Sequence, residues 1–377
     1  TQRRSYDEMA RRLDRHTGGV ALSPFSGTYF SSPETAHSFL ALQGKALDRN
    51  IEPLFTLLNE LAGEYDFRDH DRLSSLLLQY RAGMESAIVS TGHRYAITLA
   101  SRHLSPTAHI NELWHGIAQY RIIKEISDPI QTGADGRQSV AALGEKLRAI
   151  AGAVLKQGNL KPALIGDREA ILEAGNHLDA LNAVLAPAED NAGDLFGAPC
   201  LEFSPDTPLE GWITNTTVSF VGQTFKTVRM THRDAPCLSV IAKLLRSLYL
   251  HREIREKGGA YGGFAMYNAE EGLFSFGSYR DPHINRTLDV YKNACEFLLS
   301  GEFSQTDIKE AVLQVCSEID KPETPGPSAM KAFYRDIIRL SDDTRARFKD
   351  ALLAMDKASI RQAAETYFSL DEKDKGV

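Results

Sequence analysis

The sequence has few cysteines and no long hydrophobic run. It contains 377 residues but only four cysteines and two tryptophans. The cysteines form neither a CxxC pair nor a zinc-like spacing, so we interpret them as buried free thiols: Cys200, Cys237, Cys295 and Cys316. No apolar segment approaches the roughly 18 residues needed to cross a bilayer, and the start, TQRRSYDEMA, has no signal-peptide core. We therefore expect no membrane insertion.

The chain also lacks an excess of basic residues. Its formal net charge is -7 and its pI is near 5.9, whereas a general nucleic-acid binder needs a basic surface to displace counterions from phosphates. We therefore expect no nucleic-acid partner, and small or peptide substrates fit better. With 42% hydrophobic and 25% charged residues, the composition predicts a folded protein throughout.

Familiar catalytic motifs are missing too. The sequence contains no HxxEH, no HExxH, no GxxxxGK[ST], and no GxGxxG placed between a strand and a helix. His109, Glu112 and His115 form an HxxExxH pattern, but residues six apart on a helix are turned about 120° from register and do not readily share one ion. We interpret these three residues as surface or capping groups. We thus expect no metal site in this chain and no hydrolysis by this chain alone.

The length predicts more than one domain, because single hydrophobic cores rarely grow this large. We expect a first domain over residues 1–190 and a second over residues 212–377, beginning near Trp212. Between them, residues 191–211 are rich in proline, glycine and acidic residues, which is typical of a linker or a surface excursion. The absence of an initiator Met suggests that the chain is part of a longer protein.

Hydrophobic spacing predicts a mixture of strands and helices. The first domain should contain strands near residues 16–30, 36–42 and 160–167, and helices over residues 51–61, 69–88 and, in pieces interrupted at Pro106, 92–130. The second domain should contain strands near residues 215–225, 260–268 and 272–279, and helices near 237–256, 284–299, 306–319, 329–340 and 356–368.

The chain matches itself at an offset of 236 residues. Five pairs keep this offset without a gap: Phe55 and Tyr291, Leu61 and Phe297, Phe67 and Phe303, Asp71 and Asp307, Leu77 and Leu313. The repeat predicts an α+β protein with two homologous α/β sandwich domains, each a mostly antiparallel sheet covered by helices. The chain ends at DEKDKGV, where the second copy's last strand would begin. Either that strand has been removed or the second sheet is one strand short.

Several short motifs carry a resemblance to a known family. They are REIREKGGAYGGF at residues 252–264, GSYRDPH at 277–283, TGGV at 17–20, STGHRYA at 90–96 and TTVSFVGQTF at 216–225. In this order they resemble the second half of the presequence-protease branch of the pitrilysin superfamily, and the resemblance covers nearly the whole chain. It implies two homologous halves that close around a chamber for short unfolded peptides.

The same resemblance implies a division of labour between the halves. Zinc is expected in the amino-terminal catalytic half of the same polypeptide, held by an HxxEH helix and a distant Glu, and that half is the expected partner of this chain. The second half of such proteins lends an arginine and a tyrosine to the substrate. By match to the motif these are Arg255 and Tyr261, and we expect both to project into one concave face.

The residue types suit these roles. The hydroxyl of Tyr261 can donate a hydrogen bond to the oxygen that becomes negative in a tetrahedral intermediate, and the guanidinium of Arg255 can align peptide carbonyls. Gly258 and Gly259 would let the chain turn sharply between helix and strand. The local alternative is a solvated arginine at a helix end, a glycine turn and a tyrosine packed on the sheet.

Two other functions stay open. One is a catalytically silent homologue that acts as a peptide-binding or assembly subunit, and the other is a stand-alone subunit that pairs with a separate catalytic chain. An HxxEH motif encoded upstream would favour the peptidase over the silent homologue. The expected location is cytoplasmic in a bacterium and the organellar matrix otherwise.

Overall fold

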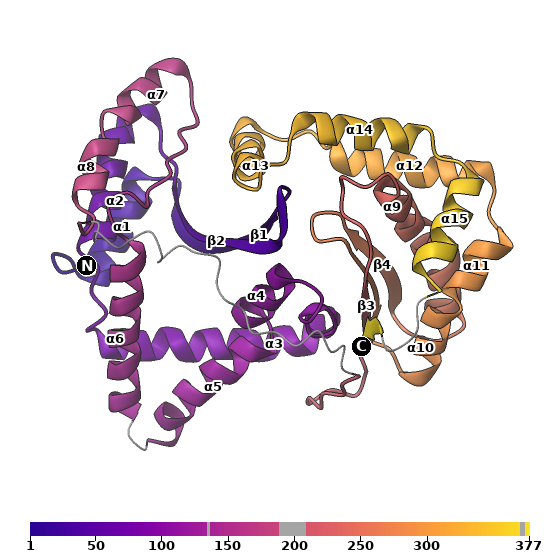
Figure 1. The fold of residues 1–377 in the computed structure, drawn as a ribbon. Coiled ribbons are helices and arrows are strands. Elements are labelled where there is room, and N and C mark those ends of the chain that lie inside the picture. Colours follow the sequence, from indigo (N-terminus) through magenta and orange to yellow (C-terminus); the bar gives the residue numbers. More distant parts are fainter. Residues whose placement is uncertain (134–135, 188–208, 370–373) are drawn as a thin grey trace.

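The computed structural model describes residues 1–133, 136–187, 209–369 and 374–377. Most of the expected linker, and Cys200 with it, lies outside these residues. Figure 1 shows two lobes, one built from the first 187 residues and the other from the residues after 209, with the β1–β2 hairpin between them. The protein mixes helices with antiparallel strands, as the sequence predicts.

The first lobe contains a long hairpin and a frame of helices. Strands β1 (Val20–Tyr29) and β2 (Ser32–Gly44) pair antiparallel and form a sheet of two strands. The helices are α1 (Tyr6–His16), the 3-10 turn η1 (Asp48–Asn50), α2 (Ile51–Gly63), α3 (His70–Ser101), α4 (Pro106–His115), α5 (Ile117–Thr132), α6 (Gly136–Val154), α7 (Arg168–Gly175) and α8 (Leu178–Ala183). The described part of this lobe is therefore less of a sandwich than the sequence predicts.

The strand predicted over residues 160–167 is wrong. This stretch is irregular in the structure, and Leu160 and Ile165 are exposed by 38% and 44%. Pro162 cannot donate to a strand ladder. The apolar side chain of Leu164 packs instead against the cluster made by α2 and α8. This apolar stretch thus supplies Leu164 as a core contact, whereas Leu160 and Ile165 face solvent.

Helix α3 is bent at Thr91, which has non-helical angles of φ -130° and ψ 32°. Its hydroxyl donates to the carbonyl of Ala87 at 2.8 Å, a back-bond that bends helices. The two arms have different neighbours. The first packs against α5 and α6, and the second leaves this lobe and packs against the second sheet.

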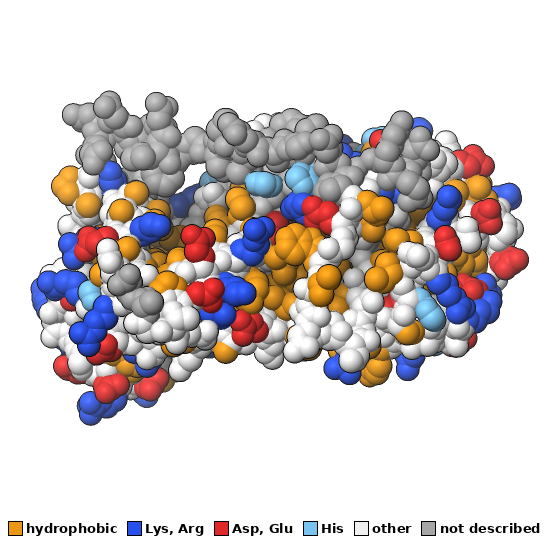
Figure 2. Space-filling view, turned by 90° about the horizontal axis from the view of Figure 1, so that it is seen from below, with side chains coloured by type: hydrophobic (Ala, Val, Ile, Leu, Met, Phe, Trp, Pro, Cys, Tyr) orange, Lys and Arg blue, Asp and Glu red, His pale blue; other side chains and the backbone are white. Residues whose placement is uncertain are grey.

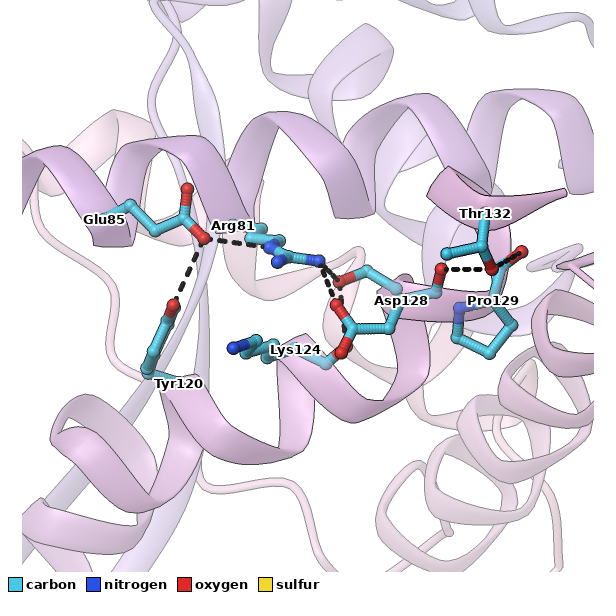
Figure 3. A network of polar contacts seen from close by, with 8 residues as sticks. Arg81, Glu85, Tyr120, Lys124, Asp128, Pro129 and Thr132 are labelled. Carbon is cyan, nitrogen blue, oxygen red and sulfur yellow. Dashed lines mark hydrogen bonds and ion pairs between the residues drawn. The ribbon is translucent and has the colours of Figure 1, made fainter.

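A polar network ties the first arm of α3 to α5 (Figure 3). The guanidinium of Arg81, whose side chain is 10% exposed, donates to Glu85 Oε1 at 2.9 Å and to Asp128 Oδ1 at 2.7 Å. It also donates to Ser127 Oγ at 3.0 Å, while Tyr120 of α5 donates to Glu85 at 3.1 Å. The network lowers the pKa of Glu85, chiefly through the hydrogen bond from Arg81.

We expect Arg81→Met to lower the free energy of unfolding by about 2 kcal/mol, because it removes hydrogen bonds to charged partners. The loss stays moderate since Glu85 and Asp128 are 46% and 50% exposed and regain water. Urea unfolding would measure it. The matched control is Arg345→Met, which breaks a pair with Asp342, whose side chain is 91% exposed; its expected cost is below about 0.5 kcal/mol. Equal losses in both variants would contradict this.

The second lobe is built on a four-stranded antiparallel sheet with the order β4-β5-β3-β6. Its strands are β3 (Gly222–Lys226), β4 (Gly262–Asn268), β5 (Leu273–Tyr279) and the short β6 (Lys375–Gly376). Strand β6 pairs with β3. The first residues of the strand expected near DEKDKGV are therefore present in the second sheet. One face of the sheet carries Phe225, Phe274 and Phe276, which lie in the main hydrophobic core.

Helices cover that core face. They are α9 (Ala235–Leu244), η3 (Leu245–Glu256), α10 (Asn285–Lys292), α11 (Ala294–Ser300), α12 (Gln305–Ile319), α14 (Asp342–Leu353) and α15 (Lys357–Tyr367). Helix α13 (Pro325–Ile337) lies near the β1–β2 hairpin instead, where Tyr334 donates to the carbonyl of Ser26. The predicted helices are confirmed, although several others, among them α1, α6 and α14, were not expected. The helix-turn-helix of the repeat recurs as α2–α3 and α11–α12, but Leu77 is buried whereas Leu313 is 67% exposed. The two copies therefore pack differently.

The opposite face of the second sheet carries small residues, and the second arm of α3 packs against it. A Cβ atom on Gly222 would lie 2.8 Å from the backbone of Ala96 and Ile97, and one on Gly376 would overlap the carbonyl of Ala100. Thr224 and Ser275 hydrogen-bond to each other at 2.9 Å and are buried. The helix thus approaches the sheet backbone closely, which links the two lobes.

Candidate functional site

Arg255 lies at the end of a π-helical segment. Helix α9 continues without a break into η3, whose twelve residues are π-helical, and this wider winding is rare and often found near functional sites. Near its end, the Lys257 N–H donates to the carbonyl of Arg252 at 3.0 Å, five residues back. The spacing of apolar residues predicted a helix here but not the wider winding, because side-chain spacing over two turns does not distinguish the two forms.

Two glycines end this helix, as the sequence suggested. Gly259 has φ +76°, a left-handed conformation that glycine adopts without strain, and its N–H donates to the carbonyl of Arg255 at 3.0 Å. A Cβ atom on Gly258 would lie 2.5 Å from the carbonyl oxygen of Ile254. Both positions therefore require glycine, and the five residues 257–261 connect η3 to β4.

The reversal brings Arg255 and Tyr261 together. The guanidinium carbon of Arg255 lies 5.7 Å from the ring centroid of Tyr261, a cation–π arrangement. Both side chains are exposed, Tyr261 by 66%. They are neither buried in the core nor separated, so the hydroxyl and the guanidinium are both available to a ligand. Their proposed contact with substrate stays a prediction.

Tyr261 belongs to a group of five aromatic rings that meet edge-on or tilted, which we call the ring cluster: Tyr261, Tyr279, His93, Phe264 and Phe220. His93 comes from the second arm of α3, and the other four come from the second lobe. His93 and Tyr279 stand inside the motifs STGHRYA and GSYRDPH. Neither residue was assigned a role from its motif, because only the fold shows that α3 reaches this sheet.

The HxxExxH residues do not form a metal centre. Glu112 is buried and turned towards the end of α4, where its Oε1 accepts a hydrogen bond from the Ala118 N–H at 2.9 Å. Burial raises the pKa of Glu112 and lowers that of His109. Within residues 1–133, 136–187, 209–369 and 374–377, no three His, Cys, Asp or Glu side chains come together as metal ligands.

Two glutamates in the β4–β5 turn make a second junction between the lobes. Glu270 accepts hydrogen bonds from the Thr28 N–H of β1 at 2.9 Å and from the Tyr334 hydroxyl of α13 at 3.0 Å. Glu271 accepts from the Ser105 hydroxyl before α4 and from Asn268 Nδ2 at 2.8 Å. Burial raises the pKa of both carboxyls, and for Glu271 the nearby Glu270 adds to the rise.

This arrangement predicts a pH dependence of stability. Because the pKa of Glu271 is raised on folding, its contribution is fully present below the ordinary glutamate pKa of about 4.3 and is lost as the pH rises through the folded-state value. We expect Glu271→Gln to remove this loss, with Asn268 Nδ2 still donating to Oε1 and the new amide Nε2 donating to Ser105 Oγ. The variant should therefore gain stability relative to the parent chain between pH 4 and pH 7 in urea titrations. Glu310→Gln, on the exposed face of α12, should show no such trend; a parallel trend would sink the interpretation.

Comparison with known proteins identifies the family of the chain. Two family descriptions match the chain: a domain associated with subfamily C of the M16 peptidases over residues 1–126, and "PreP C-terminal domain" over residues 210–376. The chain belongs to the presequence-protease type of this peptidase subfamily. It is 30% identical to the mitochondrial presequence protease of Xenopus laevis over 99% of its length and 29% identical to that of Yarrowia lipolytica over 97%. The chain spans only 38% and 36% of the lengths of these two relatives.

Solved structures show the same fold at low sequence identity. An M16 peptidase inactive domain from Pseudomonas fluorescens is 14% identical, with a TM-score of 0.59 over 99% of this chain and 82% of that one. A conserved protein from Enterococcus faecalis gives 0.61 at 14% identity over 96% and 83%. Pitrilysin gives 0.55 at 13% identity over 98% and 38%. These likenesses support the pitrilysin-type fold for this chain.

Proposed function

We propose that this chain is the substrate-binding half of a zinc metalloendopeptidase that degrades short unfolded peptides in a closed chamber. The single observation that carries the proposal is the exposed pair Arg255 and Tyr261. The guanidinium carbon of Arg255, near the end of η3, lies 5.7 Å from the ring centroid of Tyr261. Tyr261 would donate a hydrogen bond to the oxygen that gains charge at the scissile bond. Arg255 would hold peptide carbonyls through its fixed set of donors.

The surface supports a peptide ligand. Figure 2 shows hydrophobic side chains gathered in the middle of one face, between two ends where charged side chains are more frequent. Unfolded peptides expose apolar side chains, which such a surface can bury. The relatives are named presequence proteases, which is consistent with an extended peptide as substrate.

We propose that zinc is held by the amino-terminal half of the same polypeptide, which would be the partner of this chain. The described residues offer no cluster of ligands that would fit the metal. When bound in the other half, zinc supplies the activated water for hydrolysis. This chain would contribute binding and charge stabilisation from residues 212–377, with residues 1–190 as the preceding domain and 191–211 as the connection.

The location of the parent protein follows the same reasoning. The curated relatives are named mitochondrial, which supports the organellar matrix, and a bacterial parent would place the protein in the cytoplasm. Among the described helices, none is both long enough and apolar enough to span a bilayer.

The proposal is tested by comparing the complete encoded protein with this chain. The complete protein should cleave a fluorogenic unfolded peptide, stop when a chelator removes zinc, and recover when zinc is restored. The purified chain should show no turnover above background. Chelator-sensitive turnover by this chain alone would overturn the assignment, and a complete protein without turnover would favour a catalytically silent peptide-binding or assembly subunit.

A further inference from the structure

The proposed substrate tyrosine is exposed and needs a neighbour to hold its ring. Tyr261 is 66% exposed, and an exposed side chain samples several rotamers unless something packs against it. Its ring packs edge-on against Tyr279, with centroids 5.5 Å apart and planes at 86°. Its N–H also donates to the carbonyl of Tyr279 at 3.1 Å. Tyr279 therefore contacts Tyr261 through both ring and backbone.

Tyr279 is itself held from several sides. His93 of α3 meets its ring edge-on at 5.1 Å and 77°, and Phe220 lies at 5.9 Å with a tilt of 36°. The guanidinium carbon of Arg280 lies 5.6 Å from the centroid of Tyr279. The ring of Tyr279 thus contacts both Tyr261 and α3, a helix that begins in the other lobe.

His93 contributes ring packing at this junction. It also packs edge-on against Phe264 at 5.3 Å, and its buried Nδ1 finds no hydrogen-bond partner within the described part of the chain. Its neighbour Gly92 allows the close approach, because a Cβ atom there would overlap the ring of Phe220. The bend at Thr91 and the small residues on this face of the second sheet determine the position of α3.

We propose that His93 and Tyr279 are positioning residues for Tyr261. In this proposal, the packing of α3 against the second sheet fixes the orientation of the Tyr261 side chain. The proposal deepens the proposed function and rests on it for its catalytic meaning. If the Tyr261 side chain is already ordered in the folded protein, the conformational entropy of ordering it is not lost when substrate binds. A shift of α3 relative to the second sheet would then move Tyr261. This would couple the first lobe to the site.

The positioning is tested on this chain without any substrate. We would place 3-fluorotyrosine at position 261 alone and record its 19F resonance. His93→Ala removes a ring that acts on Tyr261 through Tyr279, and we expect the resonance to move at least halfway towards its unfolded-chain position. His93→Phe, which restores a ring, should return it to the parent position. An unshifted resonance in folded His93→Ala would overturn the proposal. Should His93→Ala fail to fold, His93→Gln, which fills the space without a ring, decides by the same criterion.

A second measurement separates this inference from the proposed function. In the complete protein, His93→Ala should lower kcat/KM about threefold to tenfold, the equivalent of ordering one side chain, and His93→Phe should restore most of it. A loss of stability without these two changes would indicate a merely structural role and overturn the proposal. If instead Tyr261→Phe leaves turnover unchanged while the 19F shift occurs, the proposed function fails and the positioning of Tyr261 stands.

Discussion

Tyr261→Phe is expected to lower kcat of the complete protein by about 100-fold to 1000-fold, the usual cost of removing one donor to the developing oxyanion. The KM should change little, because the donor acts mainly on the transition state. Folding should be unaffected, since the hydroxyl belongs to a side chain that is 66% exposed. Steady-state hydrolysis of a fluorogenic unfolded peptide would measure both constants.

The matched control is Tyr6→Phe, which removes the hydroxyl of another exposed tyrosine, on α1. It should leave kcat and KM at the values of the parent protein. Equal rates for Tyr261→Phe and Tyr6→Phe would show that the hydroxyl of Tyr261 does not reach the reacting carbonyl. The local alternative, a tyrosine merely packed beside Tyr279, would then explain its position.

The same measurement separates the role of Arg255. Arg255→Lys keeps the charge but loses the planar set of donors, so we expect KM to rise while kcat falls much less. This pattern would identify binding of the peptide backbone in both ground and transition states. Because Arg255 and Tyr261 are in contact, their double variant should not show simply additive effects.

Gly222→Ala is expected to lower the free energy of unfolding by about 1–3 kcal/mol, the usual cost of overpacking a tight contact. The new Cβ would lie 2.8 Å from the backbone of Ala96 and Ile97, and a helix backbone cannot move aside as a flexible side chain does. The second arm of α3 must then lift away from the sheet. Urea unfolding would measure the loss.

Gly262→Ala, in strand β4 at the edge of the same sheet, is the matched control. Nothing lies within 4 Å of a Cβ atom at that position, so its stability should stay within about 0.5 kcal/mol of the parent chain. Equal stability of the two variants would mean that α3 does not sit on the sheet as closely as the structure shows. Because His93 lies on the same arm, Gly222→Ala should also disturb Tyr279.

The resemblance carried by REIREKGGAYGGF points to Arg255, Tyr261 and their glycines directly, because the elements of this reversal are adjacent in the chain. Adjacent residues meet through local backbone geometry, and Gly258 and Gly259 are the positions where that geometry excludes a side chain. His93 could not be found in this way, since 168 residues separate it from Tyr261.

The sequence by itself determined the α+β class, most of the helices and the missing metal motif, whereas the pairing of Arg255 with Tyr261 came from the family resemblance. These features follow from periodicity and short motifs, which act over one or two turns of chain. Only the tertiary structure decided that residues 160–167 form no strand, that α3 bends at Thr91, and that its second arm packs on the other lobe. Those outcomes depend on which distant backbones approach closely, and the close approach at Gly222 and Gly376 is a property of the packed fold rather than of any local pattern.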